Sequence, residues 1–96
     1  MDHKILFTED ALADFELILD YIRADNPLAA ERFGVALLNH IELLRSFPRI
    51  GVPVPKRAGV RKLLHTPICV YYRTHEHLGL IEILHLWHGG RMPPAL

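Results

Sequence analysis

The sequence predicts an α+β fold, in which a helical hairpin packs on one face of a mostly antiparallel sheet in the order β-α-α-β-β-β. Three observations support this prediction. Apolar residues recur at helical spacing over residues 9–46, a proline-rich segment follows at 48–59, and three apolar, strand-like runs fill much of residues 60–87. A chain of 96 residues is long enough for one domain, which we expect to span residues 1–96.

The first helix is expected directly after a short strand at residues 4–7. Thr8 is a suitable N-cap, and Glu9 and Asp10 place negative charge in the first turn, where the helix dipole favours it. The apolar face consists of residues three or four apart, namely Leu12, Phe15, Leu19 and Ile22. This spacing predicts one amphipathic helix that ends near Asp25.

The second helix is expected to follow almost without a connection. Asn26 is a good N-cap, and Pro27 suits the first helical position, where its missing N–H costs nothing. Its apolar residues again lie three or four apart: Ala30, Phe33, Leu37, Ile41 and Leu44. We expect this helix to run to about Ser46 and to stop before Pro48. The short link predicts an antiparallel helical hairpin.

The second half of the chain has the pattern of a sheet. Residues 48–59 contain three prolines and two glycines, which predicts a loop with extended pieces. Three strands are then expected at Val60–His65, Ile68–Arg73 and Leu80–Trp87, the last two joined by a turn at 74–79. The face of this sheet that the helices leave open is the natural place for a functional site.

Alternation along each strand assigns side chains to the two faces of the sheet. Cys69, Tyr71 and Arg73 are expected to share one face of their strand, and Arg61 shares a face with Leu63. On the last strand the two expected rows are Glu82, Leu84, Leu86 and His88, and Ile81, Ile83, His85 and Trp87. The register between strands decides whether the arginines converge on one side.

The candidate site residues are Arg61, Arg73, His88 and Arg91. A guanidinium group binds phosphate or carboxylate through two hydrogen bonds, so three arginines with a histidine indicate an anion site. Arg61 is the strongest single candidate because it begins a strand directly after the turn at Gly59. The alternative is scattered surface charge, with the arginine stems lying over apolar residues.

The sequence lacks the residue patterns that metal binding, nucleophilic catalysis and nucleotide binding require. His85 and His88 are three apart in a strand and so point to opposite faces, while His75 and His77 lie in a turn without a cysteine nearby, so no metal is expected. His85 is interpreted as structural. No nucleophile motif and no glycine-rich nucleotide loop is present, so no cofactor is expected. The single cysteine, Cys69, is interpreted as a buried reduced thiol rather than a nucleophile.

A net charge of zero conceals two oppositely charged halves. Residues 1–47 carry nine acidic and four basic side chains, a balance of −5, and residues 48–96 carry seven basic and two acidic ones, a balance of +5. This split indicates that the basic half faces an anion or an acidic partner, unless the acidic residues merely solvate two helices. The sequence has no apolar leader and no apolar segment of the roughly 20 residues that cross a bilayer. A soluble cytoplasmic protein without membrane contact is expected.

Short motifs in a particular order carry a resemblance to one family. They are Phe7-Thr8, Asp14-Phe15, Asp20-Tyr21-Ile22, Asn26-Pro27, Arg32-Phe33, Phe47-Pro48, Arg61-Lys62-Leu63, Val70-Tyr71-Tyr72-Arg73 and His88-Gly89-Gly90-Arg91. Over nearly the whole chain, their order and spacing resemble the RelE/ParE superfamily of toxins from bacterial type II toxin–antitoxin modules, also called plasmid-stabilisation proteins. The resemblance implies the predicted fold, growth inhibition, and a cognate antitoxin as partner.

The resemblance implies one of two activities. ParE-like members inhibit DNA gyrase and are not known to be catalysts, whereas RelE-like members cut messenger RNA in the ribosomal A site without a metal ion. In a nuclease, Arg61, Arg73 and Arg91 would supply positive charge and His88 would act as acid or base. A third possibility is a degenerate member that only binds its antitoxin.

The ParE-like branch is favoured. Family nucleases often place a tyrosine near the C-terminus, or a lysine or glutamate in the central strands. This chain has no tyrosine after Tyr72 and no carboxylate between Glu42 and Glu76. Lys56 or Lys62 would have to substitute in a nuclease. The long helical hairpin, the Asn-Pro link and the terminal His-Gly-x-Arg resemble the ParE branch more closely.

The expected partners follow from the same resemblance. An amphipathic antitoxin segment would occupy hydrophobic grooves between the hairpin and the sheet, and its acidic character would suit the basic half. The other partner is DNA gyrase or, in the alternative, the ribosome with its mRNA. Because the chain has no net charge, contact with DNA is expected only through the antitoxin.

Overall fold

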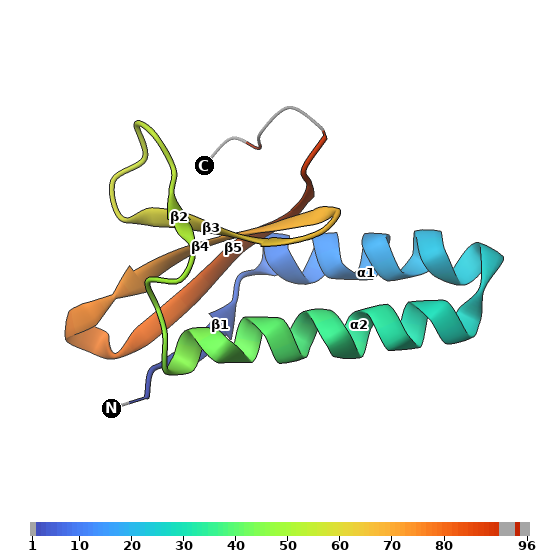
Figure 1. The fold of residues 1–96 in the computed structure, drawn as a ribbon, viewed down its shortest axis with the longest axis horizontal. Helices are drawn as coiled ribbons and strands as arrows, with labels where there is room; N and C mark the ends of the chain where they lie inside the picture. The colour runs from blue at the N-terminus through green and yellow to red at the C-terminus, as the bar shows by residue number, and fades with distance from the viewer. Residues whose placement is uncertain (1, 91–93, 95–96) are drawn as a thin grey trace.

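The computed structural model describes residues 2–90 and residue 94, and it has two layers, a sheet and a helical hairpin (Figure 1). The elements in chain order are β1 (Lys4–Phe7), α1 (Glu9–Asp25), α2 (Pro27–Glu42), the 3₁₀ turn η1 (Leu43–Arg45), β2 (Val52–Pro53), β3 (Val60–His65), β4 (Ile68–His75), the 3₁₀ turn η2 (Glu76–Leu78) and β5 (Leu80–His88). The predicted α+β class and the order of its six main elements are therefore confirmed.

The two helices begin where their capping residues predict. The Thr8 hydroxyl accepts a hydrogen bond from the Ala11 N–H at 3.1 Å, and the Asn26 side-chain oxygen accepts one from the Ala29 N–H at 3.0 Å. Pro27 occupies the first turn of α2. Because Asn26 ends α1 and also caps α2, the chain reverses there, and the helices pack side by side as the predicted hairpin (Figure 1). No helix in the described part is long and apolar enough to cross a membrane.

The sheet has five strands in the order β1-β5-β4-β3-β2. β1 pairs with β5 in parallel, and the other three pairs are antiparallel. The helices cover one face. Their buried residues join those of the sheet in the main core, which comprises Ala11, Leu37, Ile41, Leu44, Leu63, Ile68, Val70, Tyr72, Ile81, Ile83 and Leu86. We call the opposite side of the sheet the open face.

A β-bulge in β5 changes which residues reach each face. Tyr71 pairs with His85 but Tyr72 pairs with Ile83, so Leu84 is the extra residue on β5. Ile81, Ile83 and Leu86 all enter the main core, while Leu84 and Trp87 pack on the open face. Our expectation of strict alternation along residues 81–88 was therefore wrong beyond Leu84, because a bulge shifts the alternation by one residue.

The β2–β3 loop, residues 54–59, lies against the open face, away from the helices (Figure 1). Val54 packs against a small second cluster there that contains Val60, Cys69 and Tyr71. Lys56 has a φ of 63° and Gly59 a φ of 75°, both in the left-handed region. Glycine adopts this conformation freely, but a residue with a side chain does so at a cost of about 1–3 kcal/mol. The loop thus holds one strained residue, Lys56.

Candidate target-binding site

Arg61 lies on the helix-facing side of β3, because it pairs with the buried Tyr72. Its Nη1 donates to the carbonyl oxygen of Gly51 at 2.8 Å and to that of Arg49 at 3.4 Å. These carbonyl groups belong to the segment that leads into β2. The Arg61 guanidinium is therefore engaged in holding this segment against the sheet.

Tyr72 holds the same segment through two hydrogen bonds of its hydroxyl group. Its hydroxyl donates to the Pro48 carbonyl oxygen at 2.7 Å and accepts the Gly51 N–H at 3.0 Å. Burial raises the pKa of Tyr72, while the Gly51 hydrogen bond and the nearby Arg61 charge act in the opposite direction. Tyr72 and Arg61 together form a structural anchor for the segment before β2.

Arg73 lies on the opposite side of the sheet from Arg61. It shares its face of β4 with Tyr71, and its side chain passes Gly59, where a Cβ atom would lie 3.9 Å from both Arg73 Cγ and Nε. Its cross-strand partner on β5 is Glu82, whose Oε1 lies 3.0 Å from His75 Nε2. The structure therefore does not bring Arg61 and Arg73 to one anion site.

His88 is separated from both arginines. It ends β5 opposite Ile68, which is five residues from Arg73 along β4, a distance of roughly 16 Å in an extended strand. The His88 side chain is exposed, and its Nδ1 accepts the Gly90 N–H at 3.0 Å. Arg91, the fourth candidate, lies outside the described residues. The three candidates that are described thus lie at three separate places.

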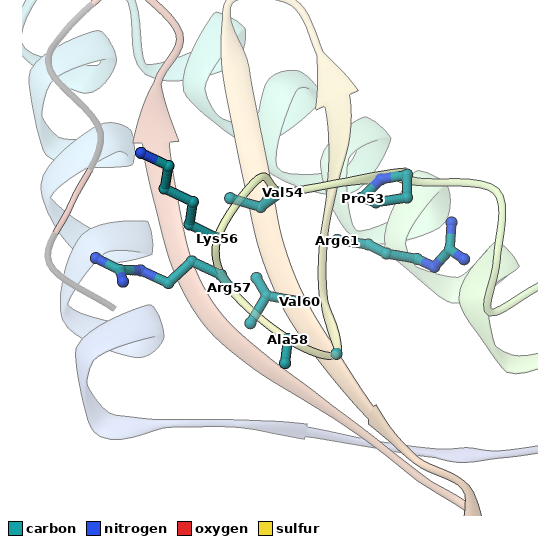
Figure 2. A pocket seen from close by; sticks show the side chains of 8 residues that line it. Pro53, Val54, Lys56, Arg57, Ala58, Val60 and Arg61 are labelled. Atoms are coloured by element: carbon teal, nitrogen blue, oxygen red, sulfur yellow. The ribbon is translucent and has the colours of Figure 1, made fainter.

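Four cationic side chains nevertheless lie on the open face or on the β2–β3 loop that packs against it, and we call them the basic face: Lys56, Arg57, Lys62 and Arg73. Lys62 reaches this face because it pairs with Tyr71. In Figure 2 the side chains of Lys56 and Arg57 extend from the β2–β3 loop on one side, and the side chain of Arg61 extends from β3 on the other. A hollow of about 600 Å³ lies at this loop, with Val54 and Val60 among its lining residues. Arg57 was not predicted as a site residue, although the sequence places it next to Lys56 in a basic pair.

The floor of the open face is apolar and buried. Tyr71 is 5% exposed and Cys69 is 7% exposed, and both pack with Trp87 and Leu84. Burial raises the pKa of Tyr71, and the neighbouring Cys69 raises it further, so the phenol is neutral at pH 7. The expectation that Cys69 is a buried, free thiol is confirmed.

His85 has the structural role predicted for it. Its Nδ1 lies 2.9 Å from Asp14 Oδ2 on α1, and the same oxygen accepts the Leu86 N–H at 3.1 Å. The Thr8 hydroxyl approaches the Ile83 and Leu84 carbonyl oxygens nearby, at 3.0 and 3.1 Å. Thr8 and Asp14, near the start of α1, thus form hydrogen bonds with the part of β5 that extends beyond the end of β1.

A pair of histidines joins the hairpin to the sheet elsewhere. Nδ1 of His40, on α2, lies 2.9 Å from Nδ1 of His65, on β3, and Phe33 packs edge-on against the His65 ring. Burial lowers the pKa of His65, and the neighbouring His40 lowers it further. Within the residues that the structure describes, no three His, Cys, Asp or Glu side chains are placed to share a metal ion.

Two solved structures share this fold. A structure of the chromosomal ParDE toxin–antitoxin system of Pseudomonas aeruginosa matches with a TM-score of 0.75 and 23% identity, over 90% of this chain and 95% of that one. The RelBE2 toxin–antitoxin complex of Mycobacterium tuberculosis matches with a TM-score of 0.70 and 21% identity, over 92% and 99%. At these identities the likeness establishes a shared α+β fold.

Sequence comparison identifies the family. The family model described as the ParE toxin of the type II toxin–antitoxin system parDE matches residues 5–93. Toxin RelE2 of Caulobacter vibrioides is 33% identical over 89 residues, which cover 93% of this chain and 98% of that protein. This chain belongs to the ParE toxin family, within the RelE/ParE superfamily of type II toxin–antitoxin systems. The predicted family is confirmed.

Proposed function

We propose that this toxin inhibits DNA gyrase by binding it, without catalysis, and that its cognate antitoxin neutralises it. The observation that carries this proposal is the separation of Arg61, Arg73 and His88. RNA cleavage needs an acid, a base and a cation within hydrogen-bonding reach of one phosphodiester, and these three side chains do not meet that requirement. A non-catalytic inhibitor requires only a complementary surface. The match to the ParE family model supports the same choice.

The antitoxin partner is supported by the solved complexes of the two structural relatives and by exposed apolar residues on the helices. Leu17 on α1 is 69% exposed and Tyr21, one turn later, is 84% exposed. A hollow of about 410 Å³ on α2 includes Leu28 and Val35. Apolar anchors of this kind suit the apolar face of an antitoxin segment. We propose that neutralisation takes place in the cytoplasm, where gyrase acts.

The test measures two purified reactions with the same toxin preparation. One is negative supercoiling of a relaxed plasmid by gyrase, and the other is ribosome-dependent cleavage of a messenger RNA. We expect supercoiling to stop at toxin excess while the mRNA stays intact, and addition of the antitoxin to restore supercoiling. Persistent supercoiling at toxin excess, together with mRNA cleavage, would reject the proposal.

Ribosome-dependent mRNA cleavage is the second candidate function. It is favoured by the relative called Toxin RelE2 and by the cations of the basic face, which include Lys62 and Arg73 on the sheet. This candidate predicts that charge removal at Arg73 abolishes cleavage. Arg61→Ala is not a diagnostic variant, because Arg61 anchors the segment before β2 and its loss would disturb the fold.

A further inference from the structure

The four side chains of the basic face carry uncompensated charge. Among the described residues, none of these four side chains forms an ion pair. In the helical layer, by contrast, Arg23 pairs with Asp20 and Arg45 pairs with Glu42. The carboxylate nearest in register to Arg73 is Glu82, and it contacts His75. A face with four cations and one engaged carboxylate therefore has a strong excess of positive charge.

The backbone of the β2–β3 loop supports a binding role for this face. Lys56 adopts a left-handed φ of 63°, which a lysine rarely occupies. Strained positions of this kind are kept where the surroundings fix them, and they gather at binding sites. Here the strained turn sends Lys56 and Arg57 out together over the same side of the loop, away from Arg61 (Figure 2).

We propose that the basic face binds the phosphodiester backbone of a nucleic acid, and that the toxin touches duplex DNA directly while it engages gyrase. This inference rests on the proposed function, and it departs from our expectation that DNA is contacted only through the antitoxin. Lysine and arginine on an open, shallow surface suit phosphate groups, which need charge but no deep pocket. A protein partner needs exposed apolar anchors. More of these lie on the helices, among them Leu17 and Tyr21, than on the open face, where Val52 and Leu64 are exposed.

The number of cations sets how strongly the binding affinity should depend on salt concentration. Four contacts to duplex phosphates give a slope of about −3.6 in a plot of log K against log salt. Affinity should then fall on the order of 100-fold between about 50 and 200 mM salt. A charge reversal that removes one contact should make this slope shallower by about one.

The experiment measures the fluorescence anisotropy of labelled oligonucleotides of about 20 nucleotides, titrated with the full-length toxin at several salt concentrations without gyrase. The probes are a DNA duplex, single-stranded DNA and single-stranded RNA of one sequence, with a poly-glutamate peptide as the protein-like anion. The variants are Arg57→Glu and Lys62→Glu. The matched control is Arg23→Glu, which changes the net charge equally but lies on α1.

Duplex binding with the predicted salt slope, lowered at least several-fold by Arg57→Glu and Lys62→Glu but unaffected by Arg23→Glu, supports the proposal. Binding to RNA alone, binding to poly-glutamate alone, or equal losses in all three variants would overturn it. A parallel supercoiling assay separates the two proposals. Gyrase inhibition without any duplex binding rejects the DNA contact alone, and duplex binding without gyrase inhibition rejects the proposed target.

Discussion

Gly51 is the glycine with the least space for a side chain. A Cβ atom there would lie 2.6 Å from the Tyr72 hydroxyl oxygen and 2.8 Å from the Lys62 carbonyl oxygen. Its N–H also donates to that hydroxyl group, and its carbonyl oxygen accepts from Arg61. The anchor of the segment before β2 thus depends on close contact between backbone and side chains.

Gly51→Ala should therefore destabilise the protein by about 2–3 kcal/mol, because neither the buried Tyr72 ring nor the β3 backbone can move away cheaply. Urea denaturation followed by circular dichroism measures the change. Gly90→Ala is the control, since among the described residues its Cβ would meet the exposed His88 ring, and we expect a change within about 0.5 kcal/mol. Equal stability of Gly51→Ala and wild type would contradict the described anchor.

Replacement of Lys56 by glycine should raise stability but weaken function. Lys56→Gly removes the strain of a left-handed lysine and should stabilise the fold by about 1 kcal/mol, while it removes one cation from the basic face. We expect a higher midpoint of urea denaturation together with weaker inhibition of supercoiling. Arg57→Gly is the matched control. Arg57 is not among the residues with positive φ, so glycine there should lower stability by adding conformational freedom to the unfolded chain. A loss of stability in Lys56→Gly would contradict strain at this position.

The contact between His40 and His65 predicts a pH dependence of stability. Burial and His40 lower the pKa of His65 in the folded state relative to 6.5, so the unfolded chain binds more protons as the pH falls. The free energy of unfolding should therefore be fully retained above pH 6.5 and decrease below it. The charged or titratable group facing His65 among the described contacts is His40, with Phe33 packed alongside.

The difference between wild type and His65→Gln isolates this contribution. Urea denaturation from pH 5 to pH 8 should show a steeper loss at low pH in wild type than in His65→Gln, whereas His77→Gln, at an exposed residue of η2, should follow wild type. Parallel curves for wild type and His65→Gln would show that the His65 pKa is not lowered.

At the scale of the elements, the start of α1 is joined to β5 by one carboxylate. Asp14 Oδ2 contacts both His85 Nδ1 and the Leu86 N–H, and it does so just beyond the bulge at Leu84. The side chain of Asp14 is only 16% exposed, so solvent screens these interactions weakly. This contact fixes the helical hairpin at the edge of the sheet.

Asp14→Asn should reduce stability by about 1–3 kcal/mol, because an amide cannot replace a charged acceptor shared by two donors. Thermal or urea denaturation at pH 7 measures the loss. Asp10→Asn is the control: Asp10 is 76% exposed and lies 4.0 Å from His85 Nε2, so we expect less than about 0.5 kcal/mol. Similar losses in the two variants would argue against a specific role of Asp14.

The helices were predictable because their signals are local. Thr8 and the Asn26-Pro27 pair mark the helix starts directly in the sequence, and the structure confirms both caps. β2 was missed because it contains two residues, one of them Pro53, which has no N–H to donate. The bulge at Leu84 was also missed, since it arises from pairing with β4 and leaves no local pattern.

The site was less predictable, because it depends on pairing and on hydrogen bonds between distant residues. The sequence shows Arg61 as a cation after a turn, but its guanidinium is occupied by the Gly51 carbonyl oxygen. Arg73 reaches the other face because the register pairs it with Val60 rather than with Arg61. The positive φ of Lys56 was not predicted either, since lysine seldom adopts it. The predicted roles of His88 and Arg91 remain predictions.

At the scale of the whole molecule, the two layers divide the charge. The acidic half of the sequence forms β1 and the helical layer, and the basic half forms β2 to β5 with the loop on the open face (Figure 1). Apolar residues of the helices, including Leu17 and Tyr21, are exposed as well. We propose that the apolar surface binds the antitoxin and that the basic face binds DNA while the toxin engages gyrase.

We propose that the toxin acts as a binding inhibitor of gyrase, and titration of gyrase supercoiling with purified toxin tests this most directly. Because a binding inhibitor acts stoichiometrically, we expect inhibition to depend on the ratio of toxin to gyrase, to be independent of incubation time, and to weaken when Lys56 and Arg57 are both replaced by glutamate. Full supercoiling at toxin excess, with substoichiometric toxin cutting mRNA on ribosomes progressively with time, would contradict the claim.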